Sequence, residues 1–331
     1  MSGSLELTER CNLRCVHCYI NQPAGDRDIR SREMDTAMVC DVLDQVAAAG
    51  CLKLLITGGE PLLRPDFLDI YLHAKRLGLL VTVFTNGTLL TEEAVECFAE
   101  YPPYSMEITL YGASVETYER VTGSTSAFGR CLNAIGMVRA HGLPLKFKSM
   151  VLKQNRHDLA AMKALAADLG IPYRFDPVLN TRLDGDPRPL DSSISIDEIL
   201  VLDREDEQRA AEYRRIVRDL RRVPTRADEV FLCGAGIHSF HIDAYGQLSL
   251  CLMARKPAYD LRQGSFQEGW DDFLRRARFQ KRTRESPCQL CDLSAICGQC
   301  PGMAQMHYGD AEAFVPSACA LAGRRLIEFG D

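Results

Sequence analysis

The chain has 331 residues, of which 46% are hydrophobic and 25% charged, with a formal net charge of −6. This composition fits a folded chain of about two domains, and it excludes disorder or a repeat architecture for the whole. No apolar run approaches the roughly 20 residues of a membrane span, no secretory signal is visible, and the acidic balance gives no general attraction to nucleic acid. We therefore expect a cytoplasmic protein with neither a membrane nor a nucleic acid as partner.

Up to about residue 180, strands and helices alternate. About thirty residues separate successive strands, which favours right-handed βαβ units and a parallel sheet. A complete (β/α)₈ barrel needs roughly 250 residues, so the pattern predicts an α/β fold with an open, partial (β/α)₆ TIM-like barrel. The predicted strands are residues 5–8, 52–57, 79–85, 105–111, 143–152 and 171–178, and the predicted helices between them are 34–49, 67–77, 92–99, 127–141 and 159–169.

The remaining chain has a different composition. Residues 180–189 are rich in Asp, Gly and Pro, which is typical of a boundary, and one charged helix is predicted over 196–222. From about residue 230 the periodicity weakens and cysteines become frequent, as expected of a small domain whose core is supplemented by metal. The sequence thus predicts a barrel over 1–185, a linker helix over 186–229 and a small metal-bearing domain over 230–331.

Fourteen cysteines in such a chain indicate metal rather than disulfides. Three of them, Cys11, Cys15 and Cys18, follow the first predicted strand. Three thiolates on one loop can hold three irons of a [4Fe–4S] cluster and leave the fourth iron open. The alternative is a structural zinc site, which needs four ligands and usually takes them from two Cys-x₂-Cys pairs. The unequal gaps and the lack of a fourth nearby ligand in the sequence favour the cluster.

Three further motifs follow the next three predicted strands, at residues 58–61, 85–87 and 109–112. Because the carboxyl ends of parallel strands meet at one edge, these motifs are expected to converge where ligands bind. Each motif alone is more often a simple turn, but together they indicate a site. Glycines let the backbone approach a ligand closely, and carboxylate, amide and hydroxyl groups bind amines and hydroxyls. The residues expected in these roles are Gly58, Gly59, Glu60, Thr85, Asn86 and Thr109.

Residues of roughly 4 to 180 resemble the radical SAM superfamily, whose signature is Cys-x₃-Cys-x-aromatic-Cys with, in this chain, His17 in the aromatic position. The resemblance implies that S-adenosylmethionine (SAM) binds the open iron and is cleaved by one electron to a 5′-deoxyadenosyl radical, which abstracts hydrogen from substrate. It also implies that Gly58, Gly59 and Glu60 contact the methionine amino group. Three further residues lie where the family contacts the ribose or the methionyl carboxylate: Thr85, Asn86 and Thr109.

The C-terminal cysteines carry a second pattern. A zinc ribbon built from two Cys-x₂-Cys pairs would leave three other cysteines unused, and the five residues between its pairs are tight for a ribbon. The spacing instead resembles the SPASM extension of radical SAM enzymes, which carries two auxiliary [4Fe–4S] clusters and gives three in all. The resemblance implies one complete set, Cys288, Cys291, Cys297 and Cys319, and one set of three, Cys233, Cys251 and Cys300.

This chain departs from the SPASM pattern at two points. Two residues rather than three precede the last clustered cysteine, and residues 234–250 hold no fourth cysteine for the incomplete set. Either a non-cysteine ligand completes that set, for which His238, His241 and Asp243 are candidates, or one iron faces the cavity. The sequence leaves these alternatives open.

Candidates for catalysis are weaker. Arg174 and Asp176 alternate with apolar neighbours on the sixth strand, so they either line the barrel cavity or form an internal ion pair. Tyr111, at the end of the fourth strand, is either rim packing or a radical relay. Residues 275–284 hold six basic side chains, which favour a solvated helix face over a docking site.

The resemblance implies oxidative modification, typically crosslinking, of a ribosomally made peptide or protein side chain. Because the first strand begins within five residues of the first residue, we expect a separate protein to recognise a leader peptide. A flavodoxin- or ferredoxin-type reductant is implied as electron donor. Two alternatives stay open: radical oxidation or decarboxylation of a small molecule such as a porphyrin or an aminoglycoside precursor, and a metal-binding scaffold without activity.

Overall fold

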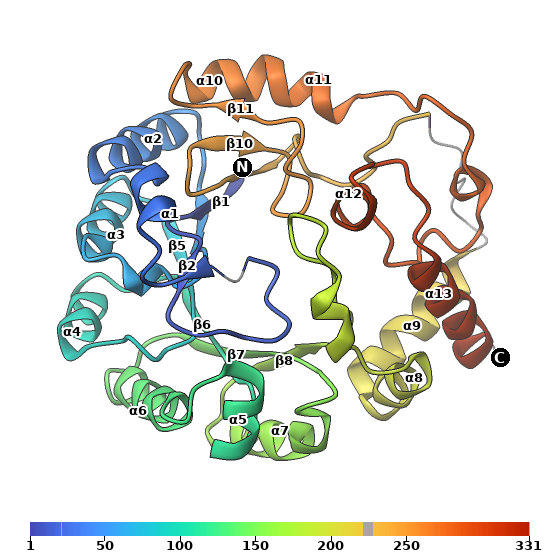
Figure 1. Cartoon of the computed structure of the whole chain (residues 1–331), viewed down its shortest axis with the longest axis horizontal. Coiled ribbons are helices and arrows are strands. Elements are labelled where there is room, and N and C mark those ends of the chain that lie inside the picture. The colour runs from blue at the N-terminus through green and yellow to red at the C-terminus, as the bar shows by residue number, and fades with distance from the viewer. Residues whose placement is uncertain (21, 221–227, 331) are drawn as a thin grey trace.

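The computed structural model describes residues 1–20, 22–220 and 228–330, and its strands form one large sheet and one short ladder. Most of these strands are four to six residues long, and they pair edge to edge around an open barrel (Figure 1). They are β1 (Ser2–Glu6), β2 (Arg10–Cys11), β3 (Gln22–Pro23), β4 (Lys53–Thr57), β5 (Leu80–Thr85), β6 (Ser105–Thr109), β7 (Leu145–Met150), β8 (Tyr173–Asp176), β9 (Ser239–Ile242), β10 (Gln247–Ser249) and β11 (Tyr259–Asp260).

Helices surround the sheet and build most of the C-terminal region. The α-helices are α1 (Arg27–Arg32), α2 (Thr36–Ala48), α3 (Phe67–Arg76), α4 (Glu92–Glu100), α5 (Val115–Thr122), α6 (Ala127–Ala140), α7 (Leu159–Asp168), α8 (Ile196–Glu205), α9 (Glu207–Asp219), α10 (Phe266–Glu268), α11 (Arg275–Arg278), α12 (Pro301–Tyr308) and α13 (Pro316–Phe329). Shorter turns are η1 (Pro61–Leu63), η2 (Arg156–Asp158), η3 (Arg188–Ser192), the π-helical η5 (Gly269–Leu274) and η6 (Pro287–Leu290).

The large sheet has nine strands in the order β11-β10-β9-β1-β4-β5-β6-β7-β8. From β1 to β8 the neighbours follow chain order and all pair in parallel. The helices that connect them lie outside the curved sheet (Figure 1). This arrangement confirms the predicted partial (β/α)₆ barrel.

The C-terminal region extends the same sheet. Strand β9 pairs in parallel with β1, with Leu5 opposite Ile242, and β10 and β11 continue it as antiparallel strands. The sheet therefore crosses the two boundaries that the sequence predicts at residues 185 and 230. As a consequence, the strand that leads to the first cysteines pairs directly with a strand of the cysteine-rich C-terminal region.

The two faces of the barrel sheet differ in chemistry. On the outer face Ile108 and Phe147 are fully buried, and Ser149 donates to the Met162 sulfur of α7 at 3.7 Å. Because side chains alternate along a strand, the neighbouring residues Glu107 and Lys148 point into the barrel. The barrel interior is thus lined with charged groups, whereas the apolar core lies under the helices.

Three details differ from the sequence prediction. The single helix expected over 196–222 is two helices, because the backbone at Asp206 is extended (ψ 108°) and its carboxylate accepts from the Arg209 N–H of the second helix; residues 221 and 222 lie outside the described chain. Helices α1 and α5 were not predicted.

In the described residues, no helix is long and apolar enough to span a membrane.

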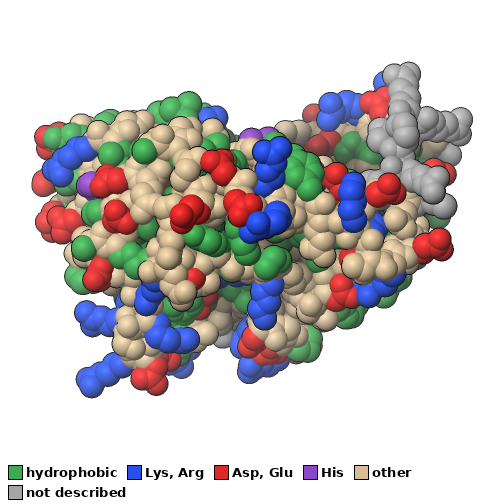
Figure 2. All heavy atoms as spheres, turned by 90° about the horizontal axis from the view of Figure 1, so that it is seen from above, with side chains coloured by type: hydrophobic (Ala, Val, Ile, Leu, Met, Phe, Trp, Pro, Cys, Tyr) green, Lys and Arg blue, Asp and Glu red, His purple; other side chains and the backbone are tan. Residues whose placement is uncertain are grey.

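The basic segment 275–284 comprises α11 and the six residues that follow it. Four of its six basic side chains form ion pairs, and Figure 2 shows positive and negative side chains interspersed over the visible face. This mixture is typical of a solvated surface rather than of a site for an acidic partner. The pairs are Arg276–Asp272, Arg278–Glu229, Lys281–Glu229 and Arg284–Asp310.

Candidate active site

The first three cysteines lie together beyond the carboxyl end of β1. Burial, with the negative potential of Glu60 and Cys18, raises the pKa of Cys11 to about 12, and burial beside Cys18 and Cys11 raises the pKa of Cys15 well above its usual value. Three thiolates so placed need a cationic group between them, and an iron cluster supplies one. In the described chain, no group of three or more Cys, His, Asp or Glu side chains is spaced to hold a single metal ion. Three neighbouring thiols on one loop match the three ligands that a [4Fe–4S] cluster with one open iron needs.

The glycine pair after β4 lies against the segment that leads to Cys11. Gly58 has φ +140°, and a Cβ there would lie 2.2 Å from the Thr8 carbonyl oxygen; at Gly59 it would lie 2.4 Å from the Arg10 oxygen. The Gly59 and Glu60 N–H groups donate to the Thr8 and Arg10 carbonyls at 2.8 and 3.0 Å. The glycines thus let two loops run side by side beneath the cysteines.

Glu60 is fully buried and joins the loops that follow β4 and β5. Its Oε1 accepts from the Thr85 hydroxyl at 2.7 Å and the Leu62 N–H at 3.2 Å, and its Oε2 accepts from the Asn86 N–H at 2.7 Å. Burial raises the pKa of Glu60 to about 7, against the lowering effect of these bonds. A carboxylate offers about four acceptor positions, so one is left for a ligand amine.

Asn86 belongs to a polar cluster that holds Cys11. Its Nδ2 donates to Asn12 Oδ1 at 3.0 Å and to the Cys11 sulfur at 3.8 Å, and its Oδ1 accepts from the Thr88 hydroxyl at 2.6 Å. Asn12 donates in turn to Thr88 at 2.8 Å. Sequence reasoning missed Asn12 and Thr88, although both adjoin predicted site residues. Thr109, by contrast, is half-buried at the end of β6.

His17 and Tyr111 lie beside the cysteine trio. Their ring centroids are 5.8 Å apart, and burial lowers the pKa of His17 to about 4, so its imidazole is neutral. His17 Nδ1 is buried without a hydrogen-bond partner in the described chain. Tyr111 interacts with the Cys15 thiol and packs edge-on against Tyr118. Both rings thus face the loop that would hold the cluster.

The predicted charges on β8 are placed differently from one another. Arg174 pairs with Glu107 of β6 at 2.7 Å, its side chain being 62% exposed, so it forms an ion pair on the inner face of the barrel. Asp176 is exposed and accepts from the Val178 N–H at 2.8 Å. Lys148 lies over the Phe84 ring, 3.0 Å from the ring centroid, and burial lowers the pKa of Lys148 to about 7. The cation of this wall whose pKa lies nearest to neutral pH is therefore Lys148, for which the sequence left the same two interpretations open as for Arg174 and Asp176.

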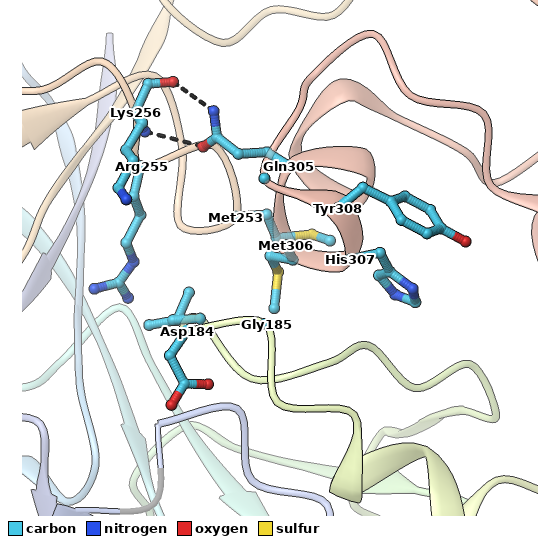
Figure 3. A pocket seen from close by; sticks show the side chains of 11 residues that line it. Asp184, Gly185, Met253, Arg255, Lys256, Gln305, Met306, His307 and Tyr308 are labelled. Carbon is cyan, nitrogen blue, oxygen red and sulfur yellow. Dashed lines mark hydrogen bonds between the residues drawn. The ribbon is translucent and has the colours of Figure 1, made fainter.

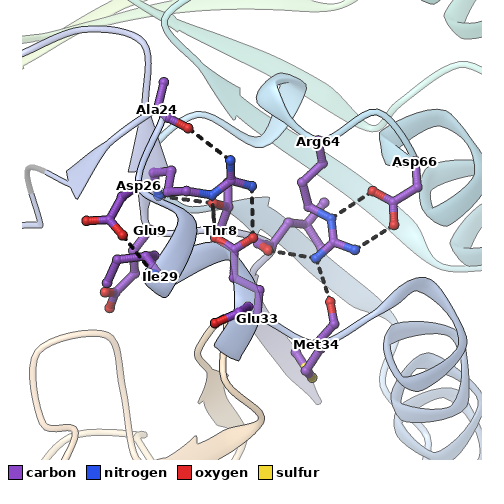
Figure 4. A network of polar contacts seen from close by, with 12 residues as sticks. Thr8, Glu9, Ala24, Asp26, Ile29, Glu33, Met34, Arg64 and Asp66 are labelled. Carbon is purple, nitrogen blue, oxygen red and sulfur yellow. Dashed lines mark hydrogen bonds and ion pairs between the residues drawn. The ribbon is translucent and has the colours of Figure 1, made fainter.

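Two arginines fix the segment between β1 and Cys11 (Figure 4). Arg10 donates to both oxygens of Glu33, at 3.0 and 2.9 Å, and to the Ala24 carbonyl. Arg64 donates to the Leu7 and Met34 carbonyls and to both oxygens of Asp66. The bidentate pairs tie the cysteine loop to α1, α2 and α3, so these arginines are positioning residues.

The C-terminal cysteines form two groups. Burial raises the pKa of Cys251, and the nearby thiols of Cys300 and Cys233 raise it further. Burial likewise raises the pKa of Cys297, together with the thiols of its own group. The membership matches the sets implied by the SPASM resemblance: Cys233, Cys251 and Cys300 in one, and Cys288, Cys291, Cys297 and Cys319 in the other.

The three candidates for a missing fourth ligand are placed in different surroundings. His241 is fully buried and points toward Ser4 and Glu6. Asp243 accepts from the backbone N–H groups of Tyr245 and Gln247 in a turn. The ring of His238 lies directly over Gly234, where a Cβ would be 2.0 Å away, and Gly234 follows Cys233. His238 is thus the candidate beside its cysteine group.

A cavity of about 410 Å³ lies between the loop 183–185, residues 253–256 and the end of α12 (Figure 3). One wall is the loop 183–185, and the Leu183 N–H donates to the carbonyl of Tyr19, the residue after Cys18. The facing walls are residues 253–256, which follow Cys251, and the end of α12, which begins at Cys300. The cavity is therefore lined by segments that follow Cys251 and Cys300, and its third wall is hydrogen-bonded to the residue after Cys18.

The comparison with protein families decides the classification. Residues 5–166 match the family model described as Radical SAM superfamily. The chain belongs to the radical SAM superfamily. The predicted resemblance is confirmed over the barrel, and the radical SAM barrel carries the trio and the three rim motifs at the expected edge.

Relatives of this radical SAM enzyme extend the comparison. The chain is 29% identical over 325 residues to the AdoMet-dependent heme synthase of Methanosarcina barkeri, a match that covers 92% of both chains. It is 33% identical over 170 residues to the PqqA peptide cyclase of Gluconobacter oxydans, covering 51% of this chain but only 47% of that relative. The crystal structure of Streptococcus suis SuiB bound to precursor peptide SuiA shares the fold, with a TM-score of 0.75, 17% identity, and coverage of 96% and 75% of the two chains.

Proposed function

We propose that this radical SAM enzyme oxidatively modifies, by crosslinking, a side chain of a ribosomally made peptide. The observation that carries the proposal is the place of the cavity: one wall, at Leu183, is hydrogen-bonded to Tyr19 of the trio's loop, and the facing wall holds Met253, after Cys251. A substrate held there lies between a radical source and an electron acceptor. The likeness to PqqA peptide cyclase and to peptide-bound SuiB supports a peptide as that substrate.

We assign three [4Fe–4S] clusters to the three cysteine groups. When bound, the first cluster together with SAM would supply a 5′-deoxyadenosyl radical. The chain's own residues shape that site. Gly58 and Gly59 let the loop after β4 lie close to the segment that leads to Cys11, and Glu60 keeps one acceptor position for the methionine amino group. His17 and Tyr111 cover the trio from the side of β6 and exclude water from it. His238 is our candidate for the ligand that completes the Cys233 group.

The decisive experiment measures 5′-deoxyadenosine and substrate mass together. Anaerobically reconstituted enzyme is incubated with SAM, dithionite and any short cysteine- or aromatic-rich peptide found encoded beside its gene, with the Cys15→Ala variant as matched control. We expect 5′-deoxyadenosine above background and a peptide that has lost two hydrogen atoms, both absent in the variant. Unchanged peptide together with no rise in 5′-deoxyadenosine would contradict a peptide substrate.

One observation favours a second candidate, the oxidation or decarboxylation of a porphyrin. The relative that matches 92% of the chain is a heme synthase, whereas the match to the peptide cyclase covers about half of each chain. The same assay with a free-acid porphyrin separates the two functions. A rise in 5′-deoxyadenosine with the porphyrin and not with the peptide would favour this second candidate.

Two partners belong to the proposal. A separate small protein would recognise the leader of the peptide, and a flavodoxin- or ferredoxin-type protein would donate the electron. For the first, we expect the leader peptide to bind this chain weakly alone and tightly in the presence of a recognition protein encoded nearby. Tight binding of the leader by this chain alone, measured by fluorescence anisotropy, would contradict a separate recognition protein.

A further inference from the structure

Arg255 on the wall of the cavity has donors to spare. Its Nη2 donates to Glu6 Oε1 at 2.5 Å, its Nη1 to Glu9 Oε1 at 3.3 Å and its Nε to the Leu252 carbonyl at 3.0 Å. A guanidinium has five N–H donors, so two lack a partner among the described residues. The side chain is 15% exposed, and Figure 3 shows it on the opposite side of the cavity from His307. The free donors, one on each terminal nitrogen, match the fork geometry of a carboxylate.

Behind Arg255 lies an unsatisfied buried pair. Glu6 and His241 are both fully buried, and Glu6 Oε2 and His241 Nε2 each lack a hydrogen-bond partner in the described chain. These two atoms are 3.9 Å apart. His241 is held in place from its other side, where Nδ1 lies 2.9 Å from the Ser4 hydroxyl. Leaving polar atoms unpaired in a protein interior costs free energy, so packing alone does not account for this pair.

We propose that Arg255 binds a carboxylate of the substrate through its two free N–H donors, and that Glu6 takes up a proton when it does so. The inference rests on the proposed function, because it takes from it that the substrate binds in this cavity. Among the described residues that line the cavity, Arg255 and Lys256 are cationic, and the one acid is Asp184. An acidic side chain of a peptide and a propionate of a porphyrin offer the same chemistry.

The electrostatics of Glu6 agree with this coupling. Burial raises the pKa of Glu6 to about 7, although Arg255 lowers it, so the carboxyl is near half ionised at neutral pH. A ligand carboxylate on Arg255 adds a negative charge and competes for the guanidinium, which raises the pKa of Glu6 further. The proton then resides on the Glu6 carboxyl, whose Oε2 faces His241 Nε2 at 3.9 Å. The charged and titratable groups that face Glu6 are Arg255, Glu9, Asp243, Tyr19 and His241.

The binding test uses the complete, cluster-loaded enzyme without reductant, so that no turnover occurs. Calorimetry compares a blocked Gly/Ala hexapeptide with one central Glu to its Gln counterpart, and a free-acid porphyrin to its methyl ester. We expect the acid of at least one pair to bind roughly tenfold more tightly. The preference should vanish in Arg255→Gln and persist in the matched control Arg204→Gln, which removes a surface ion pair with Glu328.

The proton test repeats the titration in two buffers of different ionisation enthalpy. The wild type should take up about half a proton per ligand at pH 7 and more at pH 8. Because Arg255→Gln leaves Glu6 buried without its cation and can fail to fold, Glu6→Gln provides the independent test: it should keep the acid preference and take up no proton. Equal affinity for acid and neutral ligands in both pairs, or unchanged uptake in Glu6→Gln, would overturn the proposal. A preference seen with the porphyrin alone would retain the carboxylate site and reject the peptide function.

Discussion

At Gly59 the loop after β4 is confined by a single backbone atom, the carbonyl oxygen of Arg10. A methyl group there would meet the Arg10 carbonyl oxygen at 2.4 Å, and a backbone atom moves less easily than the end of a side chain. Gly58, the preceding residue of the same loop, is similarly confined by the Thr8 carbonyl oxygen. Small shifts at these two residues therefore reach Cys11 directly.

We predict that Gly59→Ala lowers the free energy of unfolding by roughly 1–3 kcal/mol through overpacking. The displaced loop should also lower the iron bound by the trio and the rate of SAM cleavage. Urea denaturation and iron analysis measure both effects. The control is Gly129→Ala in α6, where a Cβ meets nothing within 4 Å; it should raise stability by roughly 0.5–1 kcal/mol. Equal effects of the two substitutions would contradict the close approach.

The buried carboxyl of Glu6 predicts a pH dependence of stability. Its pKa is raised from 4.5 to about 7 in the folded chain, so the folded state holds the proton more tightly than the unfolded state. Stability from this group is complete below pH 4.5 and is lost as the pH rises to about 7. Urea denaturation is measured from pH 4.5 to 8. The wild type should lose stability relative to Glu6→Gln as the pH rises from 4.5 to about 7. A difference that is independent of pH would show that Glu6 has an ordinary pKa.

The residues found from sequence are those with a chemical signature. The ten cysteines proposed as ligands and the glycine pair stand in recognisable spacings. The structure brings the trio and the glycine pair together at the carboxyl edge of the barrel and gathers the other cysteines in two groups. Asn12, Thr88 and Arg255 were not found, because each is an ordinary polar residue whose role comes from contacts with distant segments. The available signals were the positions of Asn12 next to Cys11 and of Thr88 next to the motif at residues 85–87.

The elements that carry the site are held by buried ion pairs. Arg10 and Glu33 are 7% and 5% exposed and make two parallel hydrogen bonds between the β2 segment and the end of α1. Breaking a buried pair leaves an uncompensated charge, which costs more than removing both partners. The pair therefore connects the stability of the barrel rim to the place of the cysteines.

We predict that Arg10→Met lowers the free energy of unfolding by about 3–5 kcal/mol, and that Arg10→Met combined with Glu33→Met recovers most of the loss. A double-mutant cycle by urea denaturation measures the coupling. The exposed pair Arg276–Asp272, with side chains 70% and 67% exposed, is the control, and Arg276→Met should cost less than about 1 kcal/mol. Additive effects of the two buried substitutions would contradict the coupling.

Among the elements, the barrel strands were predictable because apolar runs bounded by glycines fix both their type and their order. The break at Asp206 was not, since acidic and basic residues on both sides keep good helix propensity, and the carboxylate acts through Lys163 of α7 as well as Arg209. Helix α5 escaped because its residues Val115–Thr122 include β-branched side chains that favour strands. Contacts between distant segments decide both cases.

At the scale of the whole molecule, the three thiol groups predict a stoichiometry. Three cubes of four irons give about twelve iron and twelve sulfide per chain after anaerobic reconstitution. Cys15→Ala should lower the iron and the sulfide to about eight per chain, because the two C-terminal groups are built from other elements. It should also abolish SAM cleavage, because the first cluster is lost. His238→Ala tests the remaining ligand by magnetic resonance, through loss of nitrogen coupling at one auxiliary centre. Bound zinc in place of iron would refute all three assignments.

Strand β1 has a neighbour on each side, β4 from the barrel and β9 from the last third of the chain. A nascent chain made only as far as residue 185 lacks β9, and one side of its first strand then exposes unpaired backbone groups to other chains. Synthesis of some fifty further residues has to follow before that side is sealed. An expression vector that ends after the barrel should therefore yield aggregates rather than a smaller enzyme.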